Sequence, residues 1–567
     1  MRTLGTPRAC LAAVLAAVAG CTPSQYAQQA DQDACAVVGE ARRYALDDAR
    51  PFRVDYKPYS PGDANEAASI TAGGKVIPLA PDAKPVQITL DECLEVAFRN
   101  SRSFQARREE LYSAALALAN SRRGWDFPLL GGAAAGSAGR TVVNRGGEAN
   151  FGEFTPDATL TQRLAQGGVA TLGVSVELLS DLLGWRSTTV GSLLSANFTQ
   201  PLLRGAWRGL AYEAQYRTER DFLFSVLEYE RFTQTFGVGI LTQYYAVLQQ
   251  RDQLENERSN IERLEQTFAL TKTLVEGGIR SPIEQDQAEQ NLIDAKVRIQ
   301  RDQQDYRDSL DRFKISLGLP VSARLELNYP GALETLNQVG PKPIPVDEDA
   351  ALAVAMLTRP DVLRQAAATR DADRDVEIAT DAFLPALDVT LGISAPGTGP
   401  RDFTRTQFHR HTRQATVAFD YELDQTDNRD AYRNAMLARD QARRGWAEFL
   451  DQLRLDIGRS YRSLVQSQNS YALEMRNVEI AKRRRKLAVL QQKEGQASAR
   501  DVLEAEDAFR RAQNGVTNAL ISYTTTRLQF LTTLGLVRVD EKGQLHERPE
   551  PFKFDRIQKQ YRYLAGP

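Results

Sequence analysis

The sequence predicts a mainly α-helical protein with short β-hairpins, built from two related halves. Three observations lead to this fold class: a pattern that returns along the chain, helical periodicity over stretches longer than an ordinary domain, and short segments of strict apolar and polar alternation. The 567 residues include 71 Lys and Arg against 73 Asp and Glu, so no basic surface for nucleic acid is indicated.

The N-terminus has the pattern of an export signal. Arg2 and Arg8 give a positive start, an apolar run covers residues 11–19, and small residues precede Cys21. Val18-Ala19-Gly20-Cys21 resembles the bacterial lipobox, which implies cleavage before Cys21 and acylation of its thiol. Thr22, where an Asp would resemble the inner-membrane retention signal, then favours the outer membrane. The alternative is an ordinary signal peptide with a Cys present by chance. Apart from this covalent lipid, the sequence indicates no cofactor.

No other stretch approaches the ~18 uncharged apolar residues that a membrane helix needs, so any crossing is left to strands closed into a barrel. After processing, Cys35 and Cys93 are the cysteines left to pair in an oxidising compartment. The alternative is that Cys93 is a small buried residue, because it shares a helical face with Leu94 and Ala97.

The strongest signal is a repeat within the chain. Gly278-Ile279-Arg280-Ser281-Pro282-Ile283-Glu284 returns 217 positions later as Gly495-Gln496-Ala497-Ser498-Ala499-Arg500-Asp501. The same offset relates Tyr244 to Tyr461 and Leu317-Gly318-Leu319 to Leu534-Gly535-Leu536. Nearer the N-terminus the offset is 257 to 258, so the first copy carries about 40 more residues in its strand region.

Each copy reads as helix, strand hairpin, very long helix, turn and helix. The first copy predicts a helix over 90–125, a helix from about 207 to 276 with an interruption near Gly237 and Gly239, and a return helix from Ser281. Alternation predicts strands over 172–178, 194–199, 387–393 and 417–423, and strand-like residues 157–178 exceed one hairpin. Such alternation fits a half-buried sheet or a membrane barrel with a polar lumen.

These boundaries divide the chain into six segments. They are a signal peptide (1–20), a lipidated N-terminal segment (21–87), repeat 1 (88–319), a Pro-rich linker (320–345), repeat 2 (346–537) and a polar C-terminal tail (538–567).

The pattern resembles the TolC family of outer-membrane factors over nearly all of residues 88–537. Its more specific pieces are the run from Ser195 to Gly205 (SANFTQPLLRG) and the run from Asp501 to Ala505 (DVLEA). The resemblance implies a homotrimer, an α-helical barrel continuous with a shared transmembrane β-barrel. A periplasmic adaptor and an inner-membrane pump would dock at the far end of the helices, and lipidated members have a similar acylated N-terminus. Small-molecule efflux and type I protein secretion use the same tube, so the cargo stays open.

Three carboxylates near the turns are candidates for a gate: Glu284, Asp501 and Glu504. Helix capping alone explains Glu284 and Asp501, because each lies three residues after a Ser N-cap. If three copies converge as the resemblance implies, Asp501 and Glu504 form stacked rings that favour cations and raise some of their own pKa values. A solvated helix face is the alternative, with equal weight.

The resemblance also predicts where the adaptor docks and how the tip is held closed. Docking falls on the turns, at Gly277, Gly278, Ser281, Gly495 and Ser498. In the family an Arg and a Tyr of the second hairpin reach an acid of the first. Glu284 matches the acid, but Ala497 and Gln492 stand at the other two positions, so Arg500 or Lys493 would have to substitute.

Other functions have weaker support. His409 and His411 share one side of a predicted strand, but Arg residues crowd them and disfavour a metal cation. The chain has no Gly-rich loop with Lys-Ser or Lys-Thr, no His-Glu-x-x-His and no Gly-x-Ser-x-Gly, so it is not predicted to be an enzyme. An outer-membrane conduit and a lipid-anchored periplasmic coiled-coil scaffold remain, and the scaffold leaves the strands unexplained.

Overall fold

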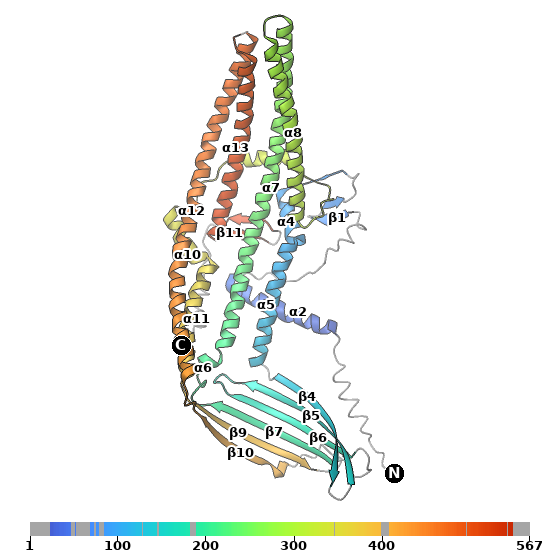
Figure 1. Cartoon of the computed structure of the whole chain (residues 1–567), viewed down its shortest axis with the longest axis vertical. Coiled ribbons are helices and arrows are strands. Elements are labelled where there is room, and N and C mark those ends of the chain that lie inside the picture. Colours follow the sequence, from blue (N-terminus) through green and yellow to red (C-terminus); the bar gives the residue numbers. More distant parts are fainter. Residues whose placement is uncertain are drawn as a thin grey trace.

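The molecule is elongated, with long helices extending from one end of a curved sheet (Figure 1). The computed structural model describes residues 23–46, 52, 69–72, 75–78, 84–126, 129–143, 147–181, 189–344, 346–398, 408–494, 496–540 and 543–547. Cys21 lies outside the described residues. Among the described helices, none combines the length and apolar character needed to cross a membrane.

The helix expected over 90–125 is divided in two. Helix α4 (Leu90–Asn100) begins with a capping box between Thr89 and Glu92, and α5 (Arg102–Asp126) follows directly. The division falls at Ser101, whose backbone is extended and whose N–H still bonds the carbonyl of Ala97. Its signal in the sequence is weak, because Ser is common on both sides of a helix boundary.

The long helix of repeat 1 is continuous. After the short α6 (Arg208–Ala211), helix α7 runs from Glu213 to Glu276 over 64 residues. The interruption expected near Gly237 and Gly239 was wrong. A Cβ on Gly237 would lie 3.0 Å from the Leu545 side chain, so this glycine permits a close approach and does not break the helix. Helix α8 (Pro282–Ser316) returns antiparallel beside α7.

Repeat 2 has the same order with an even longer helix. Its helices are α10 (Glu348–Thr358), α11 (Pro360–Asp381), α12 (Thr426–Lys493) and α13 (Ala499–Thr533). Between the repeats, β8 (Leu325–Leu327) pairs in parallel with β3 (Val86–Ile88), and α9 (Tyr329–Val339) follows. The remaining small elements are α2 (Pro23–Leu46), β1 (Ser69–Ala72), β2 (Lys75–Pro78), η1 (Phe408–Arg410), β11 (Val537–Val539) and β12 (Leu545–Glu547).

Six strands form one antiparallel sheet, in the order β10-β9-β7-β6-β5-β4. Repeat 1 supplies β4 (Leu129–Val143), β5 (Gly147–Arg163), β6 (Val169–Asp181) and β7 (Thr189–Pro201). Repeat 2 supplies β9 (Ala386–Thr398) and β10 (Thr412–Asp420). The extra residues of the first copy are therefore a second hairpin.

The strand expected over 417–423 ends three residues early. Asp424 accepts the N–H of Thr426 at 3.0 Å and starts the turn into α12, so Tyr421 and Leu423 lie outside the ladder. Apolar alternation at 421 and 423 suggested a strand, but local capping chemistry determined the boundary.

The 217-residue offset recurs in the packing. Tyr244 contacts Phe313 with ring centroids 6.2 Å apart, and Tyr461 contacts Phe530 at 6.1 Å. Gly318 follows α8 with φ +76° and Gly535 follows α13 with φ +68°. At Gly318 a Cβ would lie 2.1 Å from the Asn100 carbonyl oxygen, so only glycine fits there.

The two cysteines lie in different apolar clusters, and no disulfide joins them. Cys93 is fully buried beside Leu94 and Ala97, as its helical spacing predicted. Cys35 packs near Leu111 and Tyr112 where α2 crosses α5.

Candidate functional site

The two helical hairpins end in matching turns. Gly278, with φ +67°, follows α7, the Ile279 N–H bonds the Leu274 carbonyl at 2.9 Å, and the Gly278 N–H bonds Val275 at 2.9 Å. These two bonds satisfy carbonyls of the last helical turn that would otherwise lack a partner, and Gly278 supplies the left-handed conformation that they require. The second turn repeats the first bond, from Gln496 to Gln491 at 2.8 Å, while Gly495 lies outside the described residues.

The two tips are held together by side chains of the first hairpin on the backbone of the second. Arg280 Nη2 donates to the Ala497 carbonyl at 2.6 Å, and Glu284 Oε2 accepts the Ala499 N–H at 3.2 Å. Arg280 Nη1 also lies 3.7 Å from Glu284 Oε1. We call Arg280, Glu284, Ala497 and Ala499 the tip clasp. Since Ala499 is the first residue of α13, the Glu284 carboxylate lies at a helix N-terminus, where negative charge is stabilised.

The tip clasp differs from what the sequence predicted. Glu284 is one of its members, but within the described residues neither Arg500 nor Lys493 forms an ion pair or hydrogen bond with Glu284. Arg280 supplies the cation instead, from the same hairpin as the acid. The missed signal was Arg280 itself, which stands in the repeated motif where the second copy has Ala497.

The two carboxylates on the first turns of α13 have partners within one chain. Asp501 accepts the Ser498 N–H at 2.9 Å and its hydroxyl at 2.7 Å, and these two bonds lower the pKa of Asp501. Glu504 forms an exposed ion pair with Arg484 of α12 at 2.9 Å. The predicted capping box at Ser498 is confirmed. Ser281 caps α8 by accepting the Ile283 N–H at 3.3 Å, but the capping role predicted for Glu284 was wrong, because its carboxylate accepts the Ala499 N–H of the other hairpin.

A row of polar pairs joins α7 of the first hairpin to α13 of the second. We call it the polar seam, and its members are Gln253–Asn518 (3.3 Å), Asn256–Asn514 (2.8 Å), Glu257–Arg510 (3.4 Å) and Arg263–Glu506 (2.6 Å). Glu257 is 1% exposed and also meets Arg298 of α8 at 3.2 Å. The sequence did not predict these pairs, because nothing local distinguishes such a seam from a solvated helix face.

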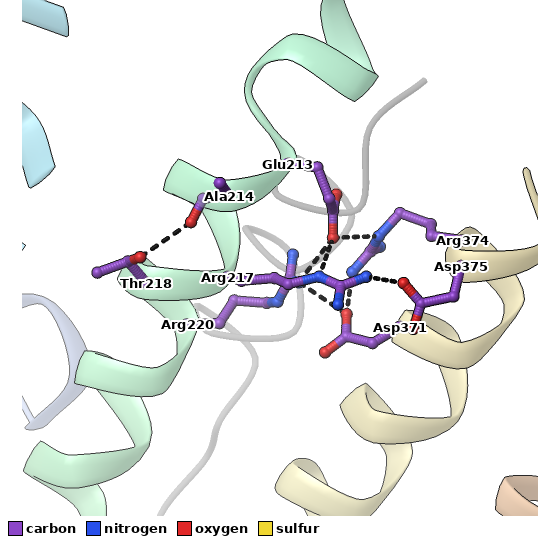
Figure 2. A network of polar contacts seen from close by, with 8 residues as sticks. All are labelled: Glu213, Ala214, Arg217, Thr218, Arg220, Asp371, Arg374 and Asp375. Atoms are coloured by element: carbon purple, nitrogen blue, oxygen red, sulfur yellow. Dashed lines mark hydrogen bonds and ion pairs between the residues drawn. The ribbon is translucent and has the colours of Figure 1, made fainter. Parts of the chain in front are cut away.

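A second ionic cluster lies where the long helices approach the sheet (Figure 2). Glu213 of α7 pairs with Arg217 at 2.8 Å, with Arg220 at 3.3 Å and with Arg374 of α11 at 3.0 Å. Arg220 continues to Asp371 of α11 at 2.7 Å. Burial alone would raise the pKa of Glu213, but the Arg217 hydrogen bond and the charges of Arg374 and Arg220 outweigh it and lower the pKa. The cluster fastens repeat 1 to repeat 2.

The six-stranded sheet has two chemically different faces. Cross-strand partners share a face, and one row joins Leu172, Ala196 and Ile393 while the neighbouring row joins Thr171, Asn197 and Gly392. The apolar face is open to solvent in the single chain, and its exposed members are Leu172, Val174, Leu391, Ile393, Val417 and Phe419. An exposed apolar surface of this kind marks a site of contact with lipid or protein.

The two histidines of the predicted strand lie at its margin. His409 is in η1 and His411 precedes β10. Over the described part of the chain, no group of three or more His, Cys, Asp or Glu gathers into a metal site.

Comparison with known proteins finds similarity at the level of structure. No family model and no curated protein matches the sequence. The CmeC outer membrane channel of Campylobacter jejuni is 16% identical, with a TM-score of 0.57 over 84% of this chain and 89% of that one. The outer membrane protein VceC of Vibrio cholerae is 15% identical, with a TM-score of 0.56 over 79% of this chain and 96% of that one.

A third solved structure agrees with these two. The open state of the MtrE outer membrane channel of Neisseria gonorrhoeae is 13% identical, with a TM-score of 0.56 over 79% of this chain and 88% of that one. Each match covers the larger part of both chains. The predicted fold class, long helices joined to a sheet of hairpins, is therefore confirmed, and the chain has the fold of bacterial outer-membrane channels.

Proposed function

We propose that this protein is the outer-membrane channel of a tripartite efflux or type I secretion system. The observation that carries the proposal is the six-stranded sheet with one exposed apolar face and one polar face, set at the end of helices of 64 and 68 residues. Lipid covers the apolar face and water the polar one. The helices then extend about 100 Å into the periplasm at 1.5 Å per residue.

A homotrimer is the assembly that this proposal requires. The long helix α12 leaves apolar residues exposed at heptad spacing, at Leu473, Ile480 and Leu487, and such a stripe suits a helix of another copy. Each copy then contributes two hairpins to one helical tube.

Purification tests the proposal directly. We expect trimers from outer-membrane fractions and stepwise conductance after reconstitution into a planar bilayer. A monomer that stays soluble after removal of its lipid, with no conductance, would refute the channel and leave the alternative, a lipid-anchored periplasmic coiled-coil scaffold.

The tip clasp is proposed to hold the channel closed. Breaking it removes two hydrogen bonds between the hairpins, so Arg280→Ala and Glu284→Ala should raise the open probability in a bilayer several-fold. Arg258→Ala is the matched control, because among the described residues Arg258 has a single exposed ion pair, with Glu255. If Arg280→Ala and Glu284→Ala open no more often than this control, the clasp does not hold the gate.

Asp501 and Glu504 are proposed to select cations when three tips converge. Replacing both with Ala should lower the preference for cations measured from reversal potentials in a salt gradient. Glu265→Ala is the control, since Glu265 pairs with Lys296 on an exposed surface. Unchanged selectivity in the double variant would leave the two carboxylates with only their capping and ion-pair roles.

The turns at Gly277, Gly278, Ser281, Gly495 and Ser498 are proposed to dock a periplasmic adaptor that links the channel to an inner-membrane pump. Cys21 is proposed to carry the lipid anchor. Mass spectrometry of the mature N-terminal peptide tests the anchor: we expect acyl chains on Cys21 and none in a Cys21→Ser variant.

A further inference from the structure

The strands of the sheet are staggered, so a row of paired residues moves away from the helix-side ends of the strands as it crosses the sheet. One row of paired residues runs from Leu130 on β4 through Leu160, Leu172, Ala196 and Ile393 to Arg413 on β10. Leu130 is one residue from the helix-side end of β4, and Arg413 is seven residues from the helix-side end of β10. The row therefore shifts by six residues across five strand pairings.

That stagger corresponds to a strand tilt. With about 3.3 Å per residue along a strand and about 4.8 Å between strands, six residues over five pairings give a tilt of roughly 40°. Strands in closed barrels tilt by about 35–45°. The single chain thus already has the strand inclination of a barrel wall.

The two edges of the sheet are suited to each other. In an antiparallel sheet of six strands the first and last strands run in opposite directions, so β10 of one copy and β4 of a rotated copy meet antiparallel. All nine residues of β10 are exposed, and among the described strands neither β10 nor β4 has a neighbour on its outer side. An open edge of this kind is a template for another strand.

We infer that β10 of one copy pairs with β4 of the next, so that every copy contributes all six of its strands to one closed barrel. This rests on the proposed function. In a trimer the barrel has eighteen strands, a number at which barrels enclose an aqueous channel. The extra hairpin β4–β5 of repeat 1 is then part of the wall and supplies the joint between copies. The part of the channel that crosses the outer membrane would then be wide. Cargo would meet the narrowest part of the channel at the tips of the helical hairpins.

The two faces of the sheet limit the register of the joint. Thr416 is on the polar face, because it pairs with Thr390, which pairs with Thr199. On β4 that face holds the odd-numbered positions, since Leu129 pairs with Thr161 and Thr161 with Thr171. Continuing the average stagger places Thr416 opposite Ala133 or Ala135.

Disulfide cross-linking tests this joint. The double variants Thr416→Cys/Ala133→Cys and Thr416→Cys/Ala135→Cys are oxidised in outer membranes with copper phenanthroline and run on a non-reducing gel. Within one chain the two edges are roughly 24 Å apart along the sheet, so a disulfide between them joins different copies. We expect covalent dimers and trimers from one of these variants.

Two controls make the result specific. Thr416→Cys/Ala134→Cys places its cysteines on opposite faces and should cross-link at least five-fold less, and Thr416→Cys alone should give no trimer ladder. Equal ladders from all three double variants would refute the register. Trimers without any ladder, or a ladder between Thr416→Cys and a cysteine on β6, would overturn the six-strand joint and leave the channel intact. If the unmodified protein is not purified as a trimer, the proposed function itself is refuted.

Discussion

The seams within the helical hairpins and the seam between the hairpins differ in their share of apolar and polar contacts. Within the first hairpin, α7 and α8 meet through Leu264, Ala288, Leu292 and Ala295. Within the second, α12 and α13 meet through Ala481, Phe509 and Ala512. The seam between α7 and α13 instead contains the row of amides and ion pairs. Its apolar contacts lie on either side of that row, at Leu503 and at Leu520 and Ile521 of α13.

The difference suggests that each hairpin moves as one unit and that the contact between the hairpins can open. Separating the two helices of a hairpin would expose apolar side chains to water at a cost in free energy, so each hairpin stays paired. Amides and charges regain hydrogen bonds from water when they part, so the hairpins can separate at lower cost. Under the proposed function, the seam that opens is the polar one.

The largest effect is expected within a hairpin. Leu292→Ala removes a side chain that is 8% exposed from the α7–α8 seam, and it should lower the free energy of unfolding by about 2–4 kcal/mol. Urea denaturation followed by circular dichroism measures it. The neighbouring Ile293→Ala is the control, because Ile293 is 54% exposed. Equal losses at both positions would contradict an apolar seam.

A smaller effect is expected in the polar seam. Glu257→Ala leaves Arg298 without its carboxylate, while Arg510 keeps Asp507 at 2.7 Å. Because the Arg298 side chain is 37% exposed and Arg510 keeps this second partner, the cost should be about 1–2 kcal/mol. Glu265→Ala, which breaks the exposed pair with Lys296, should cost below about 0.5 kcal/mol. Urea denaturation measures the free energy of unfolding of both variants. If Glu257→Ala costs as little as Glu265→Ala, the polar seam contributes no more to stability than an exposed ion pair.

The smallest effect concerns pH. Burial and the nearby Glu257 carboxylate raise the pKa of Asp302. A carboxyl whose folded pKa is raised loses stability as pH rises from its unfolded pKa through the folded one. Asp302→Asn should therefore stabilise the protein at pH 7 by below about 0.5 kcal/mol, and the gain should vanish below pH ~4. Stability measured at both values tests this, and an equal gain at both would exclude titration as the cause.

Long-range repetition made most of the fold predictable. The 217-residue offset located Tyr244, Tyr461 and both turns, and the structure repeats their packing and backbone bonds. Predictions that depended on one residue were less secure. Gly237 suggested a break in the helix, because glycine is a poor helix former. Its actual role is to make room for Leu545, a residue distant in the sequence.

The candidate gate was predictable only in part. Helix capping predicted the contacts of Asp501, because capping is a local pattern, but it was wrong for Glu284, which forms no capping box with Ser281. The partners of Glu284 were missed, because Arg280 and Glu284 bind backbone atoms of Ala497 and Ala499, and backbone atoms leave no mark in a sequence. The polar seam was missed for a similar reason: Glu257 looks like any surface acid until α13 covers it.

The uninterrupted length of α7 makes it a lever. Its 64 residues span about 96 Å at 1.5 Å per residue, so a rotation of about 5° at the sheet end displaces the tip by roughly 8 Å. The ionic cluster around Glu213 lies at the sheet end of α7, so its contacts influence the angle between α7 and the sheet. We therefore expect a substitution in this cluster to displace the tip of α7, although the two lie at opposite ends of the helix.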